Sequence, residues 1–330
     1  MRKYFGHKFE NIISINNLLS AWKEFRQDKK DKRDVLIFGS RLMDNIISLH
    51  NELANHSYTH GDYQAFNISD PKPRNIHKAT VRDRLLHHAI YRQLYPFFDN
   101  IFISDSYSCR LRKGTHRALD RFRKFAYKES QNHRKTVYVL KCDIRKFFAN
   151  IDHEILTKIL EQYIPDRDIL WLLGRVIVSF NSGKAGVGLP LGNLTSQLLV
   201  NIYMNEFDQF VKHRLKAKYY IRYADDFVIL SRDKKWLEKM LSRIGEFLWE
   251  KLKLRLHPDK ISIRTIVSGI DFLGWVQFPD HRVLRTTTKK RMFQKITEKR
   301  GKKETVQSYL GMLSHGNTEK IGEEIKRRLS

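Results

Sequence analysis

The chain has 330 residues and carries 62 Lys and Arg against 36 Asp and Glu, which gives a formal net charge of +26. Its hydrophobic content of 41%, with 12% aromatic residues, excludes a disordered basic tail. The sequence lacks a run of about 18 apolar residues, a secretory apolar core and a Cys-x-x-Cys pair. We therefore expect a folded cytoplasmic protein, without a membrane span, that binds an anionic partner.

The first part of the chain is predicted to be mainly helical. Residues 1–34 are expected to form an accessory N-terminal lead, in which an amphipathic segment ends at a charged run, and helical spacing continues over residues 34–53. Pro71-Lys-Pro-Arg74 predicts an extended turn before a helix that begins near Val81. Residues 110–135 are strongly basic and are predicted to form one basic region.

From residue 136 the pattern changes to strands separated by helices. Residues 136–142 form a β-branched and apolar run that ends at Asp143, and Asp152 is placed to cap the next helix. The glycine-rich residues 183–192 lead into a long helix with one apolar side. We therefore expect a mixed or antiparallel sheet covered by helices.

A β-hairpin is the clearest pattern in the second half. The runs 219–223 and 227–230 are typical of strands, and Ala224-Asp225-Asp226 between them are turn residues. The expected elements after it are a helix over 236–249, a short strand after Pro258, a second hairpin near Pro279-Asp-His281 and a basic helical segment over 282–303.

Three acidic residues stand at the ends of these apolar strands. If the strands are neighbours in one antiparallel sheet, the carboxylates of Asp143, Asp225 and Asp226 converge, and their repulsion favours bound cations. Oxygen ligands suit Mg²⁺, and two such ions support phosphoryl transfer. The alternative is that Asp225-Asp226 is a solvent-exposed turn and that Asp143 is a strand-end cap.

Five motifs, in order, resemble those of reverse transcriptases. The motifs are Asp143-Ile-Arg-Lys-Phe-Phe148, Gly188-Leu-Pro-Leu-Gly-Asn-Leu-Thr-Ser196, Tyr223-Ala-Asp-Asp226, Leu256-His-Pro-Asp-Lys260 and Asp271-Phe-Leu-Gly-Trp275. The resemblance extends over residues 71 to about 315. It implies an RNA-directed DNA polymerase that makes cDNA from a template RNA, with template RNA, the cDNA/RNA hybrid and dNTPs as its partners.

The resemblance also implies a fold and its subdomains. We expect an α+β right-hand polymerase, in which the palm sheet carries the Tyr-Ala-Asp-Asp hairpin and a short helical thumb follows. The expected subdomains are the lead (1–34), mainly fingers (35–135), the palm (136–275, with a helical insertion near 152–182) and the thumb (276–330). We expect no RNase H or endonuclease extension.

The resemblance implies site residues where the motifs of this chain match those of the family. Asp143, Asp225 and Asp226 are expected to be catalytic and, together with Ile144, to hold two Mg²⁺ ions, for which Mn²⁺ is a possible substitute. The residues expected to bind the nucleotide are Arg82, Arg84, Phe148, Gly192, Gln197 and Lys260, and those expected to grip the primer are Phe272, Leu273, Gly274 and Trp275.

Several of these assignments have open alternatives. Lys78 competes with Arg82 and Arg84 for the triphosphate. Phe148 matches the ring that crowds a ribonucleotide 2′-hydroxyl, but it can also be a core residue. Lys260 is expected to protonate or screen the pyrophosphate, and an exposed, solvated lysine is the alternative.

The subtype is indicated by the loop before the long helix. Leu191-Gly192 and Ser196-Gln197, with Ser106-Tyr-Ser-Cys-Arg110 and Lys113-Gly-Thr-His116, resemble reverse transcriptases of diversity-generating retroelements, from bacteria, archaea or phages. That type implies errors at template adenines, for which Arg74 and Leu191 are the candidates, and a small, basic, pentameric accessory protein. The alternatives are a group II intron-like or retron-type enzyme, or a catalytically silent RNA-binding protein.

Overall fold

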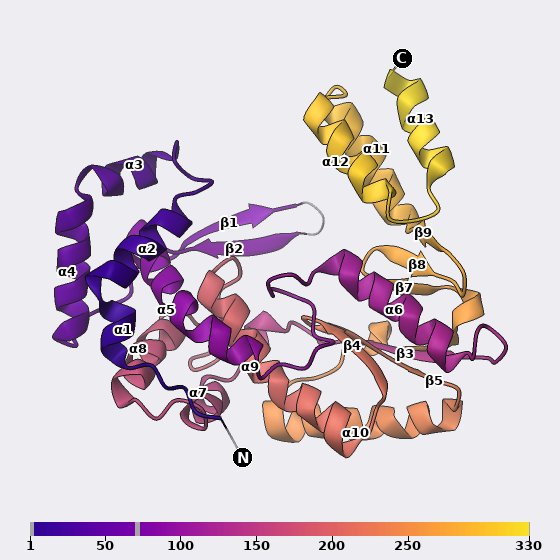
Figure 1. The fold of residues 1–330 in the computed structure, drawn as a ribbon, viewed down its shortest axis with the longest axis horizontal. Coiled ribbons are helices and arrows are strands. Elements are labelled where there is room, and N and C mark those ends of the chain that lie inside the picture. The colour runs from indigo at the N-terminus through magenta and orange to yellow at the C-terminus, as the bar shows by residue number, and fades with distance from the viewer. Residues whose placement is uncertain (1–2, 70–72, 330) are drawn as a thin grey trace. The chain divides into compact units, whose positions relative to one another are not determined.

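The computed structural model describes residues 3–69 and 73–329, so Pro71 and Lys72 of the predicted extended turn lie outside the described residues. Helices and antiparallel sheets make up an α+β fold (Figure 1). The chain divides into two compact units, which comprise residues 1–103, 144–210 and 246–255, and residues 104–143, 211–245 and 256–330. None of the described helices is long and apolar enough to cross a membrane.

Unit 1 is mainly helical. Its described elements are α1 (Phe9–Ile13), α2 (Ile15–Phe25), α3 (Arg33–Ser40), α4 (Leu42–Ala54), β1 (Gln64–Ile68), β2 (Arg74–Lys78), α5 (Val81–Asp99), η1 (Phe148–Asn150), α7 (His153–Glu161), α8 (Arg167–Val178) and α9 (Leu194–Gln209). The strands β1 and β2 form an antiparallel hairpin. Thr80 and Asp152 cap α5 and α7 through their side-chain oxygens, as helix N-termini require.

The N-terminal segment is part of unit 1 and packs against α5. The Asn17 side chain is buried, and its Nδ2 donates to the carbonyls of Ile12 (2.8 Å) and Ala89 (3.1 Å). Its Oδ1 accepts from Arg92 Nε and Gln93 Nε2, each at 3.1 Å. One buried amide thus joins α2 to the middle of α5, and the role of residues 1–34 as an accessory lead stays a prediction.

Unit 2 combines two sheets with helices. Its described elements are α6 (Thr115–Glu129), β3 (Tyr138–Asp143), β4 (Tyr219–Tyr223), β5 (Asp226–Ser231), η3 (Pro258–Lys260), β6 (Ser262–Thr265), η4 (Ile266–Ser268), β7 (Ile270–Phe272), β8 (Trp275–Gln277), β9 (Arg282–Leu284), α11 (Thr286–Glu298), α12 (Lys303–Leu313) and α13 (Glu319–Leu329). The helix α10 (Lys234–Leu252) and the short π-helix η2 (Phe210–Arg214) contribute residues to both units.

The larger sheet of unit 2 has the strand order β4-β5-β3-β6, with every neighbouring pair antiparallel. This confirms the hairpin predicted over residues 219–230. One detail differs from the prediction, because Asp226 is the first residue of β5 and pairs with Tyr223, so the turn itself consists of Ala224 and Asp225.

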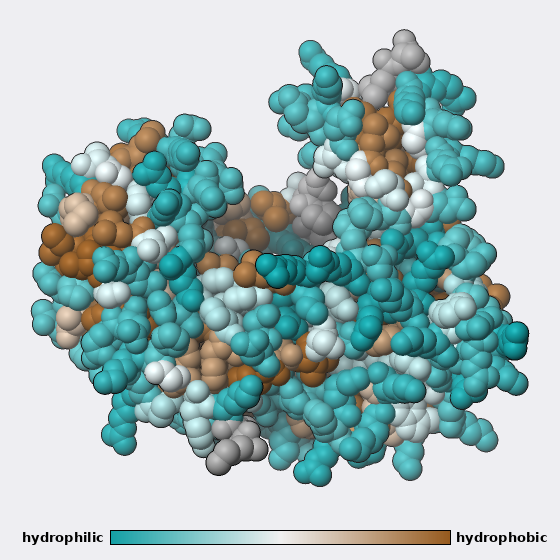
Figure 2. Space-filling view, in the orientation of Figure 1, coloured by the Kyte–Doolittle hydropathy of each residue, from teal (hydrophilic) through white to brown (hydrophobic). Residues whose placement is uncertain are grey.

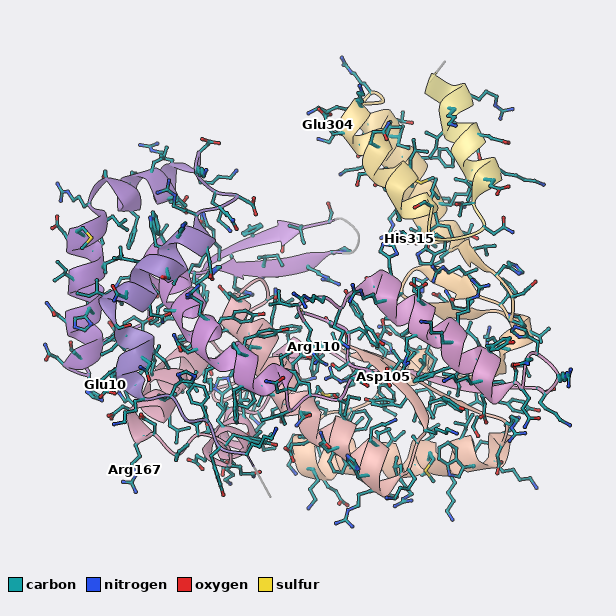
Figure 3. The ribbon with its side chains drawn as sticks, viewed as in Figure 1. Glu10, Asp105, Arg110, Arg167, Glu304 and His315 are labelled. Carbon is teal, nitrogen blue, oxygen red and sulfur yellow. The ribbon has the colours of Figure 1, made fainter. Side chains whose placement is uncertain are left out.

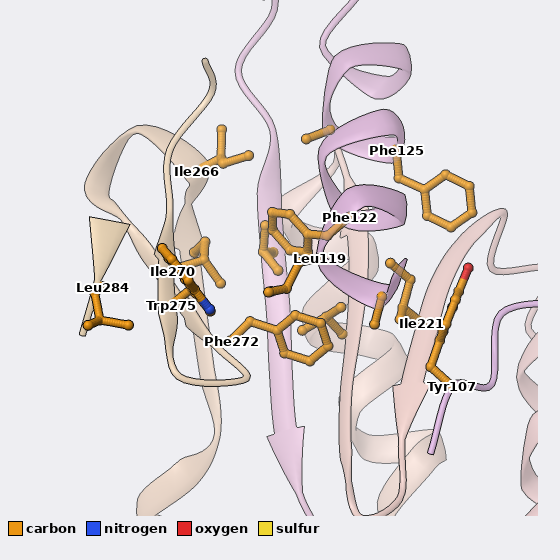
Figure 4. Packing of buried hydrophobic residues seen from close by; sticks show 14 of the residues in the cluster. Tyr107, Leu119, Phe122, Phe125, Ile221, Ile266, Ile270, Phe272, Trp275 and Leu284 are labelled. Carbon is orange, nitrogen blue, oxygen red and sulfur yellow. The ribbon is translucent and has the colours of Figure 1, made fainter. Parts of the chain in front are cut away.

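The core of unit 2 lies between α6, the larger sheet and the smaller sheet β7-β8-β9. Figure 4 shows the rings of Phe122 on α6 and Phe272 on β7 close together, with their centroids 5.9 Å apart. Trp275 on β8 is buried in the same cluster. The second predicted hairpin is confirmed as β8 and β9.

The predicted subdomain boundaries at residues 34, 135 and 275 differ from the edges of the two compact units. A compact unit is defined by contacts and can consist of several chain segments, whereas the predicted subdomains are continuous. The division into fingers, palm and thumb therefore stays a prediction.

The surface is hydrophilic over most of the face shown in Figure 2, with apolar side chains gathered over α3 and α4. The exposed apolar residues there are Leu36, Ile37, Met43 and Ile47. We call this set the α3–α4 patch.

The packing of Asn17 generates the first prediction. Asn17→Ala leaves the carbonyls of Ile12 and Ala89 without this donor, so we expect the free energy of unfolding to fall by about 2–3 kcal/mol. Asn16→Ala is the matched control, because Asn16 is exposed on the same helix. Chemical denaturation measures both variants, and equal stability of the two would contradict the role of Asn17.

Candidate active site

The three predicted carboxylates belong to one end of the larger sheet in unit 2. Asp143 is the last residue of β3 and stands directly opposite Asp226, the first residue of β5. Directly opposed residues of an antiparallel pair share a face, with Cβ atoms roughly 4.5–5.5 Å apart. Asp225 lies in the turn and directly precedes Asp226, so the strand register brings the three acidic residues together.

The electrostatics of this end are those of crowded acids. Burial raises the pKa of Asp226 to about 6; Lys141 and Lys260 act against the increase, and the charges of Asp225 and Asp143 add to it. Lys260 Nζ donates to Asp143 Oδ1 at 2.8 Å. The structure therefore balances the negative charge of the cluster with ammonium groups.

The carboxylate oxygens of Asp143, Asp225 and Asp226 are suitable ligands for a hard divalent cation. Among residues 3–69 and 73–329, no group of three or more His, Cys, Asp or Glu side chains forms a ready-made metal site. Carboxylate oxygens are nevertheless the ligands that Mg²⁺ prefers, and the raised pKa of Asp226 shows that this end of the sheet favours added positive charge. A cation beside Asp143 would share this carboxylate with the ammonium group of Lys260.

Two further predicted residues follow β3 in sequence. Ile144 is buried, which leaves its backbone carbonyl as the group that can act as a ligand. Phe147 is buried, whereas Phe148 is half-buried and meets the Phe147 ring edge-on at 5.5 Å. Phe147 thus occupies the core position, and the partly exposed ring of Phe148 is suited to a steric role.

The basic residues predicted to hold the triphosphate are paired with acids in unit 1. Arg82 contacts Glu52 and donates to the Thr59 carbonyl at 3.1 Å. Arg84 and Lys78 both reach Asp34 Oδ2, at 2.8 and 2.7 Å. Any phosphate that uses these cations must compete with Asp34 or Glu52.

A cavity of about 180 Å³ in unit 1 distinguishes Arg84 from Arg82. The residues that line it include the predicted Arg84, Gly192 and Gln197, together with Phe25, Lys29, His87, His88, Asn193 and Leu194. Arg82 is not among them. Gly192 has φ +100°, and a Cβ there would come within 2.8 Å of Ile76 Cγ2, so this position requires glycine.

Sequence reasoning missed Lys29 and His87 as lining residues of this cavity. His87 is buried, and burial lowers its pKa well below the usual value, so its ring is neutral. Lys29 lies in a charged run and His87 in the middle of a helix, and neither position carries a sequence pattern that would have pointed to the cavity.

The two predicted fidelity residues lie near opposite ends of β2 in unit 1. Leu191 is half-buried, and its carbonyl accepts from His77 N at 3.1 Å. Arg74 is exposed at the start of β2, three residues before His77, which corresponds to roughly 10 Å along a strand. The structure thus places Leu191 beside the end of β2 and Arg74 at its beginning.

The four residues of the predicted primer grip belong to the smaller sheet of unit 2 and its turn, and their role stays a prediction. The side chains of Phe272 and Trp275 are buried in the core of unit 2 and support the hairpin. The turn between them consists of Leu273 and Gly274, with φ values of +52° and +85°. Of the four predicted residues, these two are the ones left half-buried at the surface.

The fold is similar to that of apo telomerase from Candida Tropicalis, truncated from its C-terminal domain. The TM-score is 0.52 with 13% sequence identity, over 74% of this chain and 60% of that chain. At this identity the likeness concerns the fold alone.

The family is shown by the sequence. The model of the family described as reverse transcriptase (RNA-dependent DNA polymerase) matches residues 68–277. The chain therefore belongs to the reverse transcriptase family.

Two curated relatives agree with this family. Protein YkfC of Escherichia coli strain K12 is 28% identical over 254 residues, which cover 66% of this chain and 65% of YkfC. Group II intron-encoded protein LtrA of Lactococcus lactis subsp. cremoris is 26% identical over 290 residues, which cover 67% of this chain and 46% of LtrA. The chain thus spans between about half and two thirds of the length of these relatives.

The crowding of the carboxylates generates the second prediction. Since the folded-state pKa of Asp226 is raised, the stability present when it is protonated is lost as the pH rises from about 3.8 to about 6. Asp226→Asn removes the free-energy cost of an ionised carboxylate at this buried position. Without metal at pH 7.5 we therefore expect the free energy of unfolding to rise by about 2–3 kcal/mol. Below about pH 4 the difference should vanish.

Thermal unfolding in a chelator measures this effect. Asp62→Asn is the control, because Asp62 is exposed in unit 1. A lower melting temperature for Asp226→Asn than for the wild type at pH 7.5 would show that the carboxylate stabilises the metal-free fold.

Proposed function

We propose that the chain is an RNA-directed DNA polymerase, which adds deoxynucleotides to a primer along an RNA template. The observation that carries this proposal is the register of β3 against β5, which sets Asp143 opposite Asp226 and beside Asp225. The family match over residues 68–277 supports it. The net charge of +26 supports tight, salt-dependent binding of a polyanion.

In this proposal each acidic residue has a defined task. Asp143, Asp225 and Asp226, with the carbonyl of Ile144, would hold two Mg²⁺ ions or their Mn²⁺ substitutes. When bound, such ions activate the attacking hydroxyl and stabilise the leaving oxygen. Lys260 carries its ammonium group 2.8 Å from Asp143, where it would neutralise or protonate the departing pyrophosphate.

Residues of unit 1 would select the nucleotide. Arg84, Gly192 and Gln197 line one cavity, which favours Arg84 over Arg82 as a phosphate ligand. Phe148 would exclude ribonucleotides by crowding their 2′-hydroxyl, because its ring is partly exposed. In the same proposal the larger sheet of unit 2 is the palm and residues 276–330 form the thumb.

For the subtype we propose a diversity-generating enzyme that is error-prone at template adenines. The proposal is supported by the sequence Leu191-Gly192 followed by Ser196-Gln197. Leu191 places an apolar side chain where related motifs carry glutamine. The group II intron-like type is the second candidate, and it is favoured by the match to LtrA.

The α3–α4 patch is the surface we propose for a small, basic accessory protein. It exposes four apolar side chains, while Asp34 and Glu52 of the same two helices are paired with basic residues of unit 1. An exposed apolar surface of this kind suits a protein partner and offers little to a nucleic acid.

A catalytically silent RNA-binding protein is the candidate from another class. Such a protein gains nothing from three carboxylates that would face an anionic ligand, and burial together with the two neighbouring acids raises the pKa of Asp226, so its ionised form is costly. Metal-dependent primer extension separates the two classes.

The third prediction concerns the carboxylates in synthesis. Asp143→Asn and Asp225→Asn should each reduce DNA synthesis on an RNA template by at least about 100-fold, because metal ligands are lost. Binding of the template–primer hybrid should survive, since phosphate contacts come from basic residues elsewhere. Asp28→Asn, at an exposed site, is the control for charge. Full synthesis by either site variant would refute the assigned metal ligands.

The fourth prediction tests the subtype. Leu191→Gln should lower the frequency of errors opposite template adenines, because a directional hydrogen bond penalises a mispair more than an apolar contact does. Sequencing of cDNA from a defined RNA template measures the error spectrum, with the exposed Val267→Gln as the control. Uniformly accurate copying by the wild type would reject the diversity-generating subtype and leave reverse transcription standing.

A further inference from the structure

The segment before α6 extends the larger sheet of unit 2 next to the catalytic hairpin. Ser106 forms a parallel bridge with Arg222 of β4. Arg222 N donates to the Asp105 carbonyl at 3.0 Å, and Tyr107 N donates to the Arg222 carbonyl at 2.9 Å. Figure 3 shows Asp105 and Arg110 in this segment, close to β4.

The side chain of Arg222 connects this segment to the catalytic turn. Arg222 and Ser106 are both 0% exposed. One guanidinium nitrogen, Nη2, donates to Ser106 Oγ at 3.0 Å, and the other, Nη1, donates to the Ala224 carbonyl at 3.2 Å. A buried guanidinium is costly unless its donors are satisfied, so these two acceptors contribute to its orientation.

The bond to Ala224 acts on a strained part of the backbone. Ala224 has φ +54°, a left-handed conformation that residues with a Cβ seldom adopt. Its carbonyl belongs to the peptide group whose N–H is that of Asp225. Because a peptide group is planar, a hydrogen bond that fixes this carbonyl also fixes the direction in which the chain enters Asp225.

The segment that holds Arg222 is itself anchored. Arg121 on α6 pairs with Asp105 at 2.7 Å, and Lys113 Nζ donates to the Ser104 carbonyl at 2.7 Å. Thr115 Oγ1 donates to Tyr223 Oη at 3.2 Å. Ser106 therefore offers Arg222 a fixed acceptor, and α6 supports both.

We propose that Arg222 is a positioning residue, which Ser106 holds in place and which sets the peptide between Ala224 and Asp225. The direction in which the Asp225 side chain leaves the backbone is thereby set before any metal binds. This inference rests on the proposed function for its consequence in catalysis, but the ordering of the turn is a property of the chain itself. It also assigns a task to the segment Ser106–Arg110, which the polymerase reaction alone leaves unexplained.

Two variants and one control test the proposal. Arg222→Lys keeps the charge but loses the planar fork that spans two acceptors, and Ser106→Ala removes the hydroxyl alone. Ser104→Ala is the control, because Ser104 is exposed in the same segment. Hydrogen–deuterium exchange of the metal-free protein reads out the turn. Single-turnover primer extension gives the rate of nucleotide addition and the apparent affinity for dNTP.

We expect both test variants to exchange the amides of residues 224–226 at least tenfold faster than the control. The rate of addition should fall at least tenfold, while dNTP affinity changes less than twofold. Unchanged exchange in folded variants would overturn the proposal. Loss of the fold in both variants would also overturn it, because Arg222 and Ser106 would then be required for folding and not for the position of the turn. If the wild type extends no primer, the proposed function fails, and the exchange comparison still decides the role of Arg222.

Discussion

The pairing of β3 with β5 is the constraint on which the rest of the site depends. Side chains alternate between the two faces of a strand, so a slip of one residue would turn Asp143 away from Asp226. The apolar residues of both strands are buried on both faces of the sheet, so such a slip would require the core to repack. The hydrophobic core of unit 2 therefore forces two carboxylates into opposed positions, and the turn adds a third. The charge of this cluster in turn explains the position of Lys260 beside Asp143.

Burial of an acid is not by itself a sign of function, and Asp83 makes the contrast clear. Its carboxylate is fully buried in unit 1, where it accepts from Tyr58 Oη at 2.8 Å, Thr80 Oγ1 at 2.6 Å and Gly61 N at 3.1 Å. Those donors satisfy the charge, and Asp83 holds a loop against α5. Asp226 instead has a pKa raised by burial and by two further acids, and the cations of the proposed function would offset that charge.

Much of this arrangement could be predicted from the sequence, because its signals are local. Alternating apolar runs and turn residues predicted the β4–β5 hairpin, and motif order predicted the acids. The sequence could not distinguish Arg82 from Arg84, since their partners Glu52 and Asp34 lie 30 and 50 residues away. It also could not show that Phe272 and Trp275 point into the core, because a short aromatic-rich hairpin has the same pattern whichever face is buried. The burial of Arg222 depends on Ser106, 116 residues earlier.

The most direct test of the central claim is primer extension by the wild-type chain on an RNA template, measured with dNTPs and Mg²⁺ and again with a chelator. The opposed carboxylates predict DNA products that require the divalent ion and stop at the end of the template. Firm binding of the template–primer hybrid, with no extension in either Mg²⁺ or Mn²⁺, would contradict the account and favour a protein that only binds RNA.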